Sequence, residues 1–308
     1  MKIVLIGQAA FGKAVAEAIL QDGRDALGAV FCPPDSEGRP ADPLKEAALS
    51  ASVPVHQFVR LRSPAAIEQF RNVGAELCIM AFVTDIVPHE MISSPRRGTI
   101  QYHPSLLPRH RGPSSINWPI VFGETTTGLT IFWPDEGLDT GPILLQREMP
   151  IGPNDTVGSL YFQSLFPMGV ESLIEAINLV REGRAPRIAQ DESLATYEGW
   201  CRAQDAVIDW TKPAPAICNL IRGCDPQPGA HTTREGVRLQ LYDAILREPH
   251  QDVAAGGEIV EIGPDSFRVA APGGSVLVGR VRPAGGRKAA AGAYAQDAGL
   301  RVGERLGS

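Results

Sequence analysis

Apolar runs alternate with amphipathic stretches along the first two-thirds of the chain. The runs with the pattern of buried strands are residues 2–7, 26–34, 53–58, 76–83 and 98–108. Between them, residues 11–23 and 64–74 carry apolar side chains at helical spacing, and each stretch ends at a glycine, Gly23 or Gly74. This alternation predicts an α/β fold with an open, mostly parallel, Rossmann-like sheet.

The pattern changes after a longer helical stretch over about residues 156–181. One short helix at residues 213–223 is followed by short alternating runs, which Gly, Pro and Asp separate. Regularly spaced short strands with turn residues between them predict a small β-barrel of OB-like type. We therefore expect a larger α/β domain over residues 1–204 and a smaller C-terminal domain over residues 205–308.

Composition indicates a folded protein and argues against several classes. The 308 residues are 44% hydrophobic, too apolar for a disordered chain, and no apolar run reaches the roughly 20 residues that span a bilayer. The five cysteines are scattered, without a C-x-x-C pair, so we expect a cytoplasmic protein with neither disulfides nor a metal site. The net charge is −6, and residues 205–308 hold twelve acidic and twelve basic side chains, so no nucleic-acid partner is expected.

Two glycines, Gly7 and Gly12, join the first strand to the first helix. Ala9 stands where the dinucleotide fingerprint G-x-G-x-x-G has its central glycine, and no acidic residue ends the second strand to hold a ribose. A tight turn explains these glycines better than a dinucleotide site, so NAD is not expected.

Candidate chemistry lies in two segments that follow strand-like runs. In the first, His103 ends an apolar strand beside prolines, which suits a general acid or an oxyanion stabiliser, although a structural role is commoner there. The second segment carries Asp135, Glu136 and Asp139 among glycines. A carboxylate in it could orient the histidine or accept a proton, and a plain hairpin turn would also account for its Asp and Gly.

Together, these segments resemble the folate-dependent formyltransferase and hydrolase family, which carries an H-x-S-L-L-P-x-x-R-G run and a G-x-D-T-G loop. The matching residues are His103, Ser105, Leu106, Leu107, Pro108, Arg111 and Gly112, then Gly137, Asp139, Thr140 and Gly141. Residues 257–288 also resemble the family's small C-terminal domain. The chain is most similar to the hydrolase domains at the N-terminus of 10-formyltetrahydrofolate dehydrogenases, so residues 1–204 are identified as a folate-binding catalytic domain.

The resemblance implies roles for particular residues. His103 would stabilise an oxyanion or protonate the leaving nitrogen, and Asp139 would accept a proton from the nucleophile. Family transferases carry an asparagine two residues before the histidine, whereas this chain has Gln101, whose amide could still donate to the formyl oxygen from a longer arm. The pterin ring would be held by the aspartate loop and by the loop after the fourth strand, with candidates Asp85, Ile86 and Val87.

The function that the resemblance implies is hydrolysis of 10-formyltetrahydrofolate, the formyl donor, to tetrahydrofolate and formate. One alternative is transfer of the formyl group to an amine on a sugar nucleotide, on a small metabolite or, least favoured because the C-terminal part is neutral, on methionyl-tRNA. Another is a folate-binding protein whose catalytic site is disabled. The residues leave the nucleophile open, water or an amine, and give no indication of oligomeric state.

Overall fold

The computed structural model describes residues 1–248 and 255–307, and the chain divides into two compact units. Unit 1 consists of Met1–Arg111, Gly128–Glu148 and Ser164–Tyr197. Unit 2 consists of Gly112–Thr127, Met149–Gln163 and Glu198–Ser308. The chain passes between the units several times, and its last passage lies just before Glu198. The division expected after Gln204 stays a prediction.

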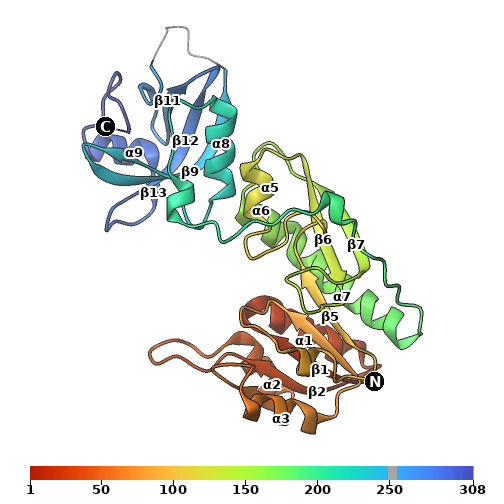
Figure 1. Ribbon diagram of the computed structural model, residues 1–308. Helices are drawn as coiled ribbons and strands as arrows, with labels where there is room; N and C mark the ends of the chain where they lie inside the picture. Colours follow the sequence, from red (N-terminus) through yellow and green to blue (C-terminus); the bar gives the residue numbers. More distant parts are fainter. Residues whose placement is uncertain (249–254, 308) are drawn as a thin grey trace. The chain divides into compact units, whose positions relative to one another are not determined.

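The larger sheet has seven strands in the order β3-β2-β1-β4-β5-β6-β7 (Figure 1). The strands are β1 (Lys2–Gly7), β2 (Ala26–Cys32), β3 (Val55–Gln57), β4 (Leu77–Ala81), β5 (Thr99–His103), β6 (Thr126–Phe132) and β7 (Ile143–Pro150). Pairs among β1 to β5 are parallel, and β6 joins β5 antiparallel. The predicted α/β fold with a mostly parallel, Rossmann-like sheet is therefore confirmed.

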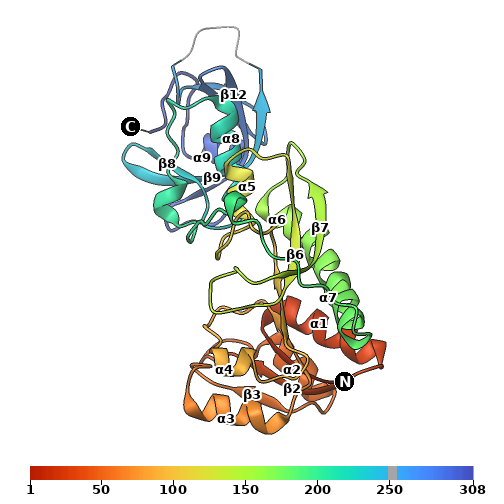
Figure 2. The ribbon, with the colours of Figure 1, turned by 45° about the vertical axis from the view of Figure 1, so that its right-hand side comes forward.

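Helices cover both faces of this sheet. They are α1 (Ala9–Asp22), α2 (Pro43–Ser50), α3 (Pro64–Val73), α4 (His89–Ile92) and α7 (Phe166–Arg181). On one face, Val4 and Ile6 of β1 pack with Phe70 of α3 and Met91 of α4. Figure 2 shows α1 and α7 on the other side of the strands. Since both faces of β1 and β4 are covered, these strands are apolar and buried except for Lys2 at the start of β1.

The glycine ends predicted for two helices are confirmed, whereas helix α2 was not predicted. Gly23 and Gly74 close α1 and α3 in the left-handed conformation, where glycine has no Cβ penalty. The hydrophobic pattern does not predict α2, which Asp42 starts as its N-cap. The carboxylate of Asp42 also accepts from the backbone N–H of Ala9, at 2.9 and 3.0 Å, and so fixes the start of α1.

Strand β5, which carries the candidate histidine, is supported from behind by aromatic rings. The helical stretch predicted at residues 156–181 is formed by α6 (Val157–Leu160), a π-helical turn (Tyr161–Leu165) and α7. Tyr102 of β5 lies 4.5 Å from Phe11 of α1, measured between ring centroids. A Cβ on Gly169 of α7 would come within 2.7 Å of the Tyr102 ring, so only glycine allows this approach. Side chains alternate along a strand, so Gln101 and His103 face away from these helices.

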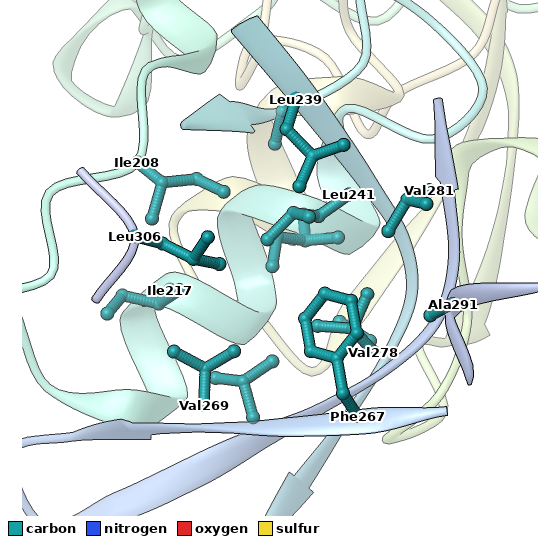
Figure 3. Packing of buried hydrophobic residues seen from close by; sticks show 14 of the residues in the cluster. Ile208, Ile217, Leu239, Leu241, Phe267, Val269, Val278, Val281, Ala291 and Leu306 are labelled. Carbon is teal, nitrogen blue, oxygen red and sulfur yellow. The ribbon is translucent and has the colours of Figure 1, made fainter. Parts of the chain in front are cut away.

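The smaller sheet is antiparallel, in the order β10-β11-β12-β9-β8, with β13 paired to β12. Its strands are β8 (His231–Arg234), β9 (Val237–Arg247), β10 (Ile259–Ile262), β11 (Phe267–Ala271), β12 (Gly274–Pro283) and β13 (Ala289–Ala290). Helices α8 (Ala214–Gly223) and α9 (Ala291–Asp297) contribute to the same core. Figure 3 shows Ile217 of α8 in that core, together with Val269 of β11 and Val278 of β12. The predicted small C-terminal domain of barrel type is confirmed as a half-barrel.

The last described residues connect the two edge strands of this half-barrel. The N–H of Gly307 donates to Thr233 of β8, and the N–H of Leu306 donates to Gly257, just before β10, at 2.8 and 2.9 Å. The Arg234 guanidinium holds this segment through the Glu304 carboxylate, with Nε to Oε1 at 2.7 Å. That hydrogen bond keeps the pKa of Glu304 below its usual range.

Within the described residues, no helix is long and apolar enough to cross a membrane.

This ion pair predicts a pH-dependent effect of Glu304→Gln. The pKa of Glu304 is depressed in the folded protein, so the pair stabilises at pH 7 and loses its contribution as the pH falls through that lowered value. We expect Glu304→Gln to lower the free energy of unfolding at pH 7 by at most about 1 kcal/mol, because solvent screens the pair. The difference from wild type should shrink below about pH 4. Urea unfolding at both pH values measures this, and Glu261→Gln is the control, because the Glu261 carboxylate is exposed and lies 3.7 Å from Arg268. An undiminished difference at low pH would contradict the assignment.

Candidate active site

Strand β5 places His103 at its carboxyl end, where ligands bind in open α/β sheets. His103 pairs with Thr130 of β6, and Gln101 pairs with Phe132. The imidazole is 5% exposed, and its ring meets the Phe132 ring edge to face. A polar side chain this deeply buried needs partners for its ring nitrogens.

Both nitrogens of the imidazole face oxygen atoms. Nε2 lies 2.9 Å from the backbone oxygen of His110, and a carbonyl can only accept, so we assign a hydrogen to Nε2. Nδ1 lies 3.6 Å from Oδ2 of Asp139, whose side chain is 6% exposed. That separation is ion-pair range and longer than a hydrogen bond. The structure thus brings together the histidine and the aspartate that the sequence singled out.

A tight loop over residues 135–141, the aspartate loop, presents Asp139. Asp139 has φ 57°, in the left-handed region, which costs energy for a residue with a side chain. A Cβ on Gly141 would lie 1.8 Å from the Trp133 oxygen, and one on Gly137 would lie 2.0 Å from Oγ1 of Thr140. Both glycines are therefore required by close approach.

The other two acidic residues of this loop do not join the histidine. Oδ1 of Asp135 accepts from the N–H of Gly137 at 3.0 Å and from the Thr140 hydroxyl at 2.6 Å. Asp135 therefore stabilises the conformation of the loop through hydrogen bonds within it. Glu136 is exposed. The hairpin interpretation therefore describes Asp135, and Asp139 is the one carboxylate of the three that faces His103.

Residues 186–197, which we call the strap, run behind the aspartate loop. The Gln190 amide nitrogen donates to the backbone oxygens of Asp139 and Gly141, at 2.9 and 2.7 Å. Ile188 exchanges backbone hydrogen bonds with Ile143, and the Trp133 indole donates to Pro186. The strap was not among the predicted site residues, since no motif marks a side chain that binds backbone 50 residues away.

Arg111 links the strap to the chain that follows His103. Its buried guanidinium donates to the amide oxygen of Gln190 at 2.8 Å and to both carboxylate oxygens of Glu192 at 2.7 and 2.9 Å. The Arg111 hydrogen bond lowers the pKa of the Glu192 carboxyl. The arginine of the sequence run is thus part of the scaffold around the histidine.

Gln101 is half-buried on the same face of β5 as His103. Within the described residues its side chain makes no hydrogen bond, which leaves the amide able to turn toward a ligand. Of the three pterin candidates, Ile86 is exposed, whereas Val87 packs into the core and Asp85 accepts from the N–H groups of Leu61 and Ile86 at 2.8 and 2.9 Å. Asp85 and Val87 therefore shape this loop, and Ile86 offers it an exposed apolar side chain; contact of the three with the pterin stays a prediction.

A pocket of about 230 Å³ opens beside the ends of β1 to β4. Gln8, Arg60, Phe82 and Asp85 are among the residues that line it, whereas His103 and Asp139 are not. In the part of the chain that the structure describes, no group of His, Cys, Asp and Glu side chains could hold a metal ion. The candidate chemistry therefore rests on the buried His103–Asp139 pair.

Sequence profiles and relatives give the family. The profile described as formyl transferase matches residues 1–177, and that of its C-terminal domain matches residues 201–299. The chain belongs to the formyl transferase family. It is 45% identical to the mitochondrial 10-formyltetrahydrofolate dehydrogenase of Mus musculus over 80% of this chain but 27% of that protein. It is 36% identical to the methionyl-tRNA formyltransferase of Moorella thermoacetica over 100% of this chain and 99% of that protein.

Two solved structures illustrate how the fold is shared. HypX from Aquifex aeolicus, in complex with tetrahydrofolic acid, superposes with a TM-score of 0.70 over 99% of this chain and 48% of its own, at 18% identity. WlaRD, a sugar 3N-formyl transferase, superposes with a TM-score of 0.69 over 91% of this chain and 97% of its own, at 19% identity. The sequence resemblance to this family of enzymes is confirmed.

The aspartate loop predicts a large effect of Gly141→Ala. The added methyl would meet the Trp133 oxygen at 1.8 Å, so the loop must open and lose its packing. We expect a loss of about 1–3 kcal/mol in the free energy of unfolding, the usual range for overpacking. Urea unfolding measures it, and Gly199→Ala is the control, because nothing lies within 4 Å of a Cβ there. Equal stability of the two variants would contradict the loop geometry.

Proposed function

We propose that this protein removes the formyl group from 10-formyltetrahydrofolate by hydrolysis, giving tetrahydrofolate and formate. The observation that carries the proposal is the buried pair of His103 and Asp139 at the carboxyl end of β5. The similarity to 10-formyltetrahydrofolate dehydrogenases supports it, although the chain spans only about a quarter of their length.

The reaction requires one group that handles protons and one that meets negative charge. The oxygen of water attacks the formyl carbon, and the carbonyl oxygen becomes an oxyanion in a tetrahedral intermediate. The bond from carbon to N10 then breaks, and N10 takes up a proton as it leaves. We assign the proton of the attacking water to the Asp139 carboxylate, and oxyanion stabilisation or protonation of N10 to His103. Such groups contribute about 10²- to 10⁴-fold each.

The pterin ring is a flat ring system with a polar edge, and it needs a slot with backbone donors and acceptors. We place it between the aspartate loop and the loop that carries Asp85, Ile86 and Val87. The exposed Ile86 supports this placement as an apolar contact, and the backbone there is held by the Asp85 carboxylate. Gln101 would donate to the formyl oxygen.

A second candidate is formyl transfer to an amine. The full-length similarity to a methionyl-tRNA formyltransferase favours it, because the match includes the C-terminal domain. Residues 205–308 carry equal numbers of acidic and basic side chains, so tRNA is the least favoured acceptor, and a small amine is preferred. We also propose a cytoplasmic location, which the five free cysteines support, and we keep residues 1–204 as the catalytic domain.

The test is incubation with 10-formyltetrahydrofolate while tetrahydrofolate and formate are measured, with and without candidate amines. Hydrolysis predicts equal amounts of the two products in buffer alone. Product formation only after an amine is added would favour transfer. Binding of folate without turnover under either condition would favour a disabled site.

The His103–Asp139 pair predicts the effect of two substitutions. Asp139→Asn keeps the shape and tolerates the left-handed backbone but removes the charge, so we expect turnover to fall at least about 10²-fold. His103→Ala should do the same. Folate affinity, measured by calorimetry, should stay within about tenfold, or 1.4 kcal/mol. Glu136→Gln, an exposed carboxylate of the same loop, is the control and should stay active. Wild-type turnover of either variant, correctly folded, would overturn the assignment.

Gln101 should act as a helper. Gln101→Ala removes at most one hydrogen bond to the formyl oxygen, worth about 1 kcal/mol, so we expect a loss of about tenfold or less. Gln101→Asn restores the residue of the transferases and should favour amines over water when both are offered. The ratio of formylated amine to formate measures this. If Gln101→Ala loses more turnover than Asp139→Asn, the two roles are reversed.

A further inference from the structure

Two residues beside the imidazole have left-handed backbone conformations and are not glycine. Asp139 has φ 57° and provides the carboxylate, and His110 has φ 56° and provides the carbonyl that accepts from Nε2 of His103. L residues rarely adopt this conformation, and it persists only where neighbouring groups hold it. Side chains of the strap form hydrogen bonds to the backbone of both residues.

On the side of the Asp139 carboxylate, the hydrogen bonds come from the Gln190 amide. Its nitrogen has two hydrogens, and they go to the backbone oxygens of Asp139 and Gly141, on either side of Thr140. Its oxygen accepts from Nη2 of Arg111 at 2.8 Å and from Nε at 3.2 Å, so the amide orientation is fixed. Gln190 thus sets where the backbone of Asp139 lies.

On the side of the His103 imidazole, the hydrogen bond is made with the Thr196 hydroxyl. Its oxygen accepts from the backbone N–H of His110 at 2.8 Å. The backbone of Thr196 also bonds to this segment, accepting from the N–H of Arg111 at 3.1 Å and donating to the Pro108 oxygen at 3.2 Å. The carbonyl of His110 is thereby aimed at Nε2 of His103, which decides how the ring presents Nδ1 to Asp139.

We propose that the strap is the element that sets the His103–Asp139 geometry, with Gln190 and Thr196 as positioning residues on its two sides. The inference deepens the proposed function and rests on it for the nature of the reaction. Catalytic groups displaced by about 1 Å lose about 10²-fold in rate, so a support of this kind acts on turnover rather than on substrate binding.

The test compares four strap variants. Gln190→Glu keeps the shape and the oxygen that faces Arg111 but cannot donate to the two carbonyls, and Gln190→Met removes the amide without adding charge. Thr196→Val removes the hydroxyl at constant shape, and Thr196→Ser keeps it. Leu194→Ala, an exposed side chain of the same strap, is the control.

We expect both Gln190 variants and Thr196→Val to lose about 10- to 100-fold in kcat, with folate affinity by calorimetry within about threefold. Thr196→Ser and Leu194→Ala should stay within about twofold of wild type. A loss that appears only in KM, or a Thr196→Ser variant as poor as Thr196→Val, would overturn the proposal, since the hydroxyl would then not be the cause.

A second readout does not depend on the reaction. The backbone amide of His110 should exchange its hydrogen faster in Thr196→Val than in wild type and Thr196→Ser, because its acceptor is gone. An unchanged exchange rate in Thr196→Val would contradict the proposed hydrogen bond between Thr196 and the His110 backbone. If the three proteins show this difference in exchange but wild type forms no tetrahydrofolate, the proposed hydrolysis fails while the strap's contact with His110 stands.

Discussion

The site depends on one contact, the approach of a carboxylate to an imidazole inside unit 1, with Oδ2 of Asp139 3.6 Å from Nδ1 of His103. Both side chains are almost fully buried, where removing charge from water is costly unless partners compensate. The surrounding structure provides those partners. The backbone oxygen of His110 accepts a hydrogen bond from Nε2 of His103. The Gln190 amide of the strap donates to the backbone oxygen of Asp139 and so holds the residue that carries the carboxylate. Removing one partner would leave the other buried and uncompensated.

This contact needs conformations that an ordinary loop would not adopt. Asp139 and His110 lie in the left-handed region, and Gly137 and Gly141 lie where a methyl group would collide with neighbours. Each of these choices lowers the intrinsic stability of the loops, and the sheet behind them offsets the cost. Tyr102 packs on Phe11 and on α7 behind β5, so the strand that carries His103 is supported from that side. Rigid support for a strained site is a common arrangement in enzymes.

Much of this could be predicted from the chain because the signals were local. The apolar runs of β1 and β4, the glycine ends of α1 and α3, and the histidine and aspartate runs each lie within a few residues. The missing parts depend on contacts far apart in sequence. Helix α2 was missed although Asp42 and Pro43 are typical helix-starting residues, because this short helix buries only Leu44 and Ala48 and so shows little apolar periodicity. Gln190 and Thr196 bind backbone 49 and 86 residues away, which leaves no periodic pattern. The roles of Asp85 and Val87 required knowing which side chains are buried.

The central claim is that water attacks a formyl carbon held beside His103 and Asp139. It is tested most directly by incubating the protein with 10-formyltetrahydrofolate in ¹⁸O-enriched water and weighing the formate by mass spectrometry. Attack by water predicts formate that carries one ¹⁸O atom, formed in step with tetrahydrofolate, and almost none of it from Asp139→Asn. Formate without the label, or labelled formate made equally fast by Asp139→Asn, would contradict the account.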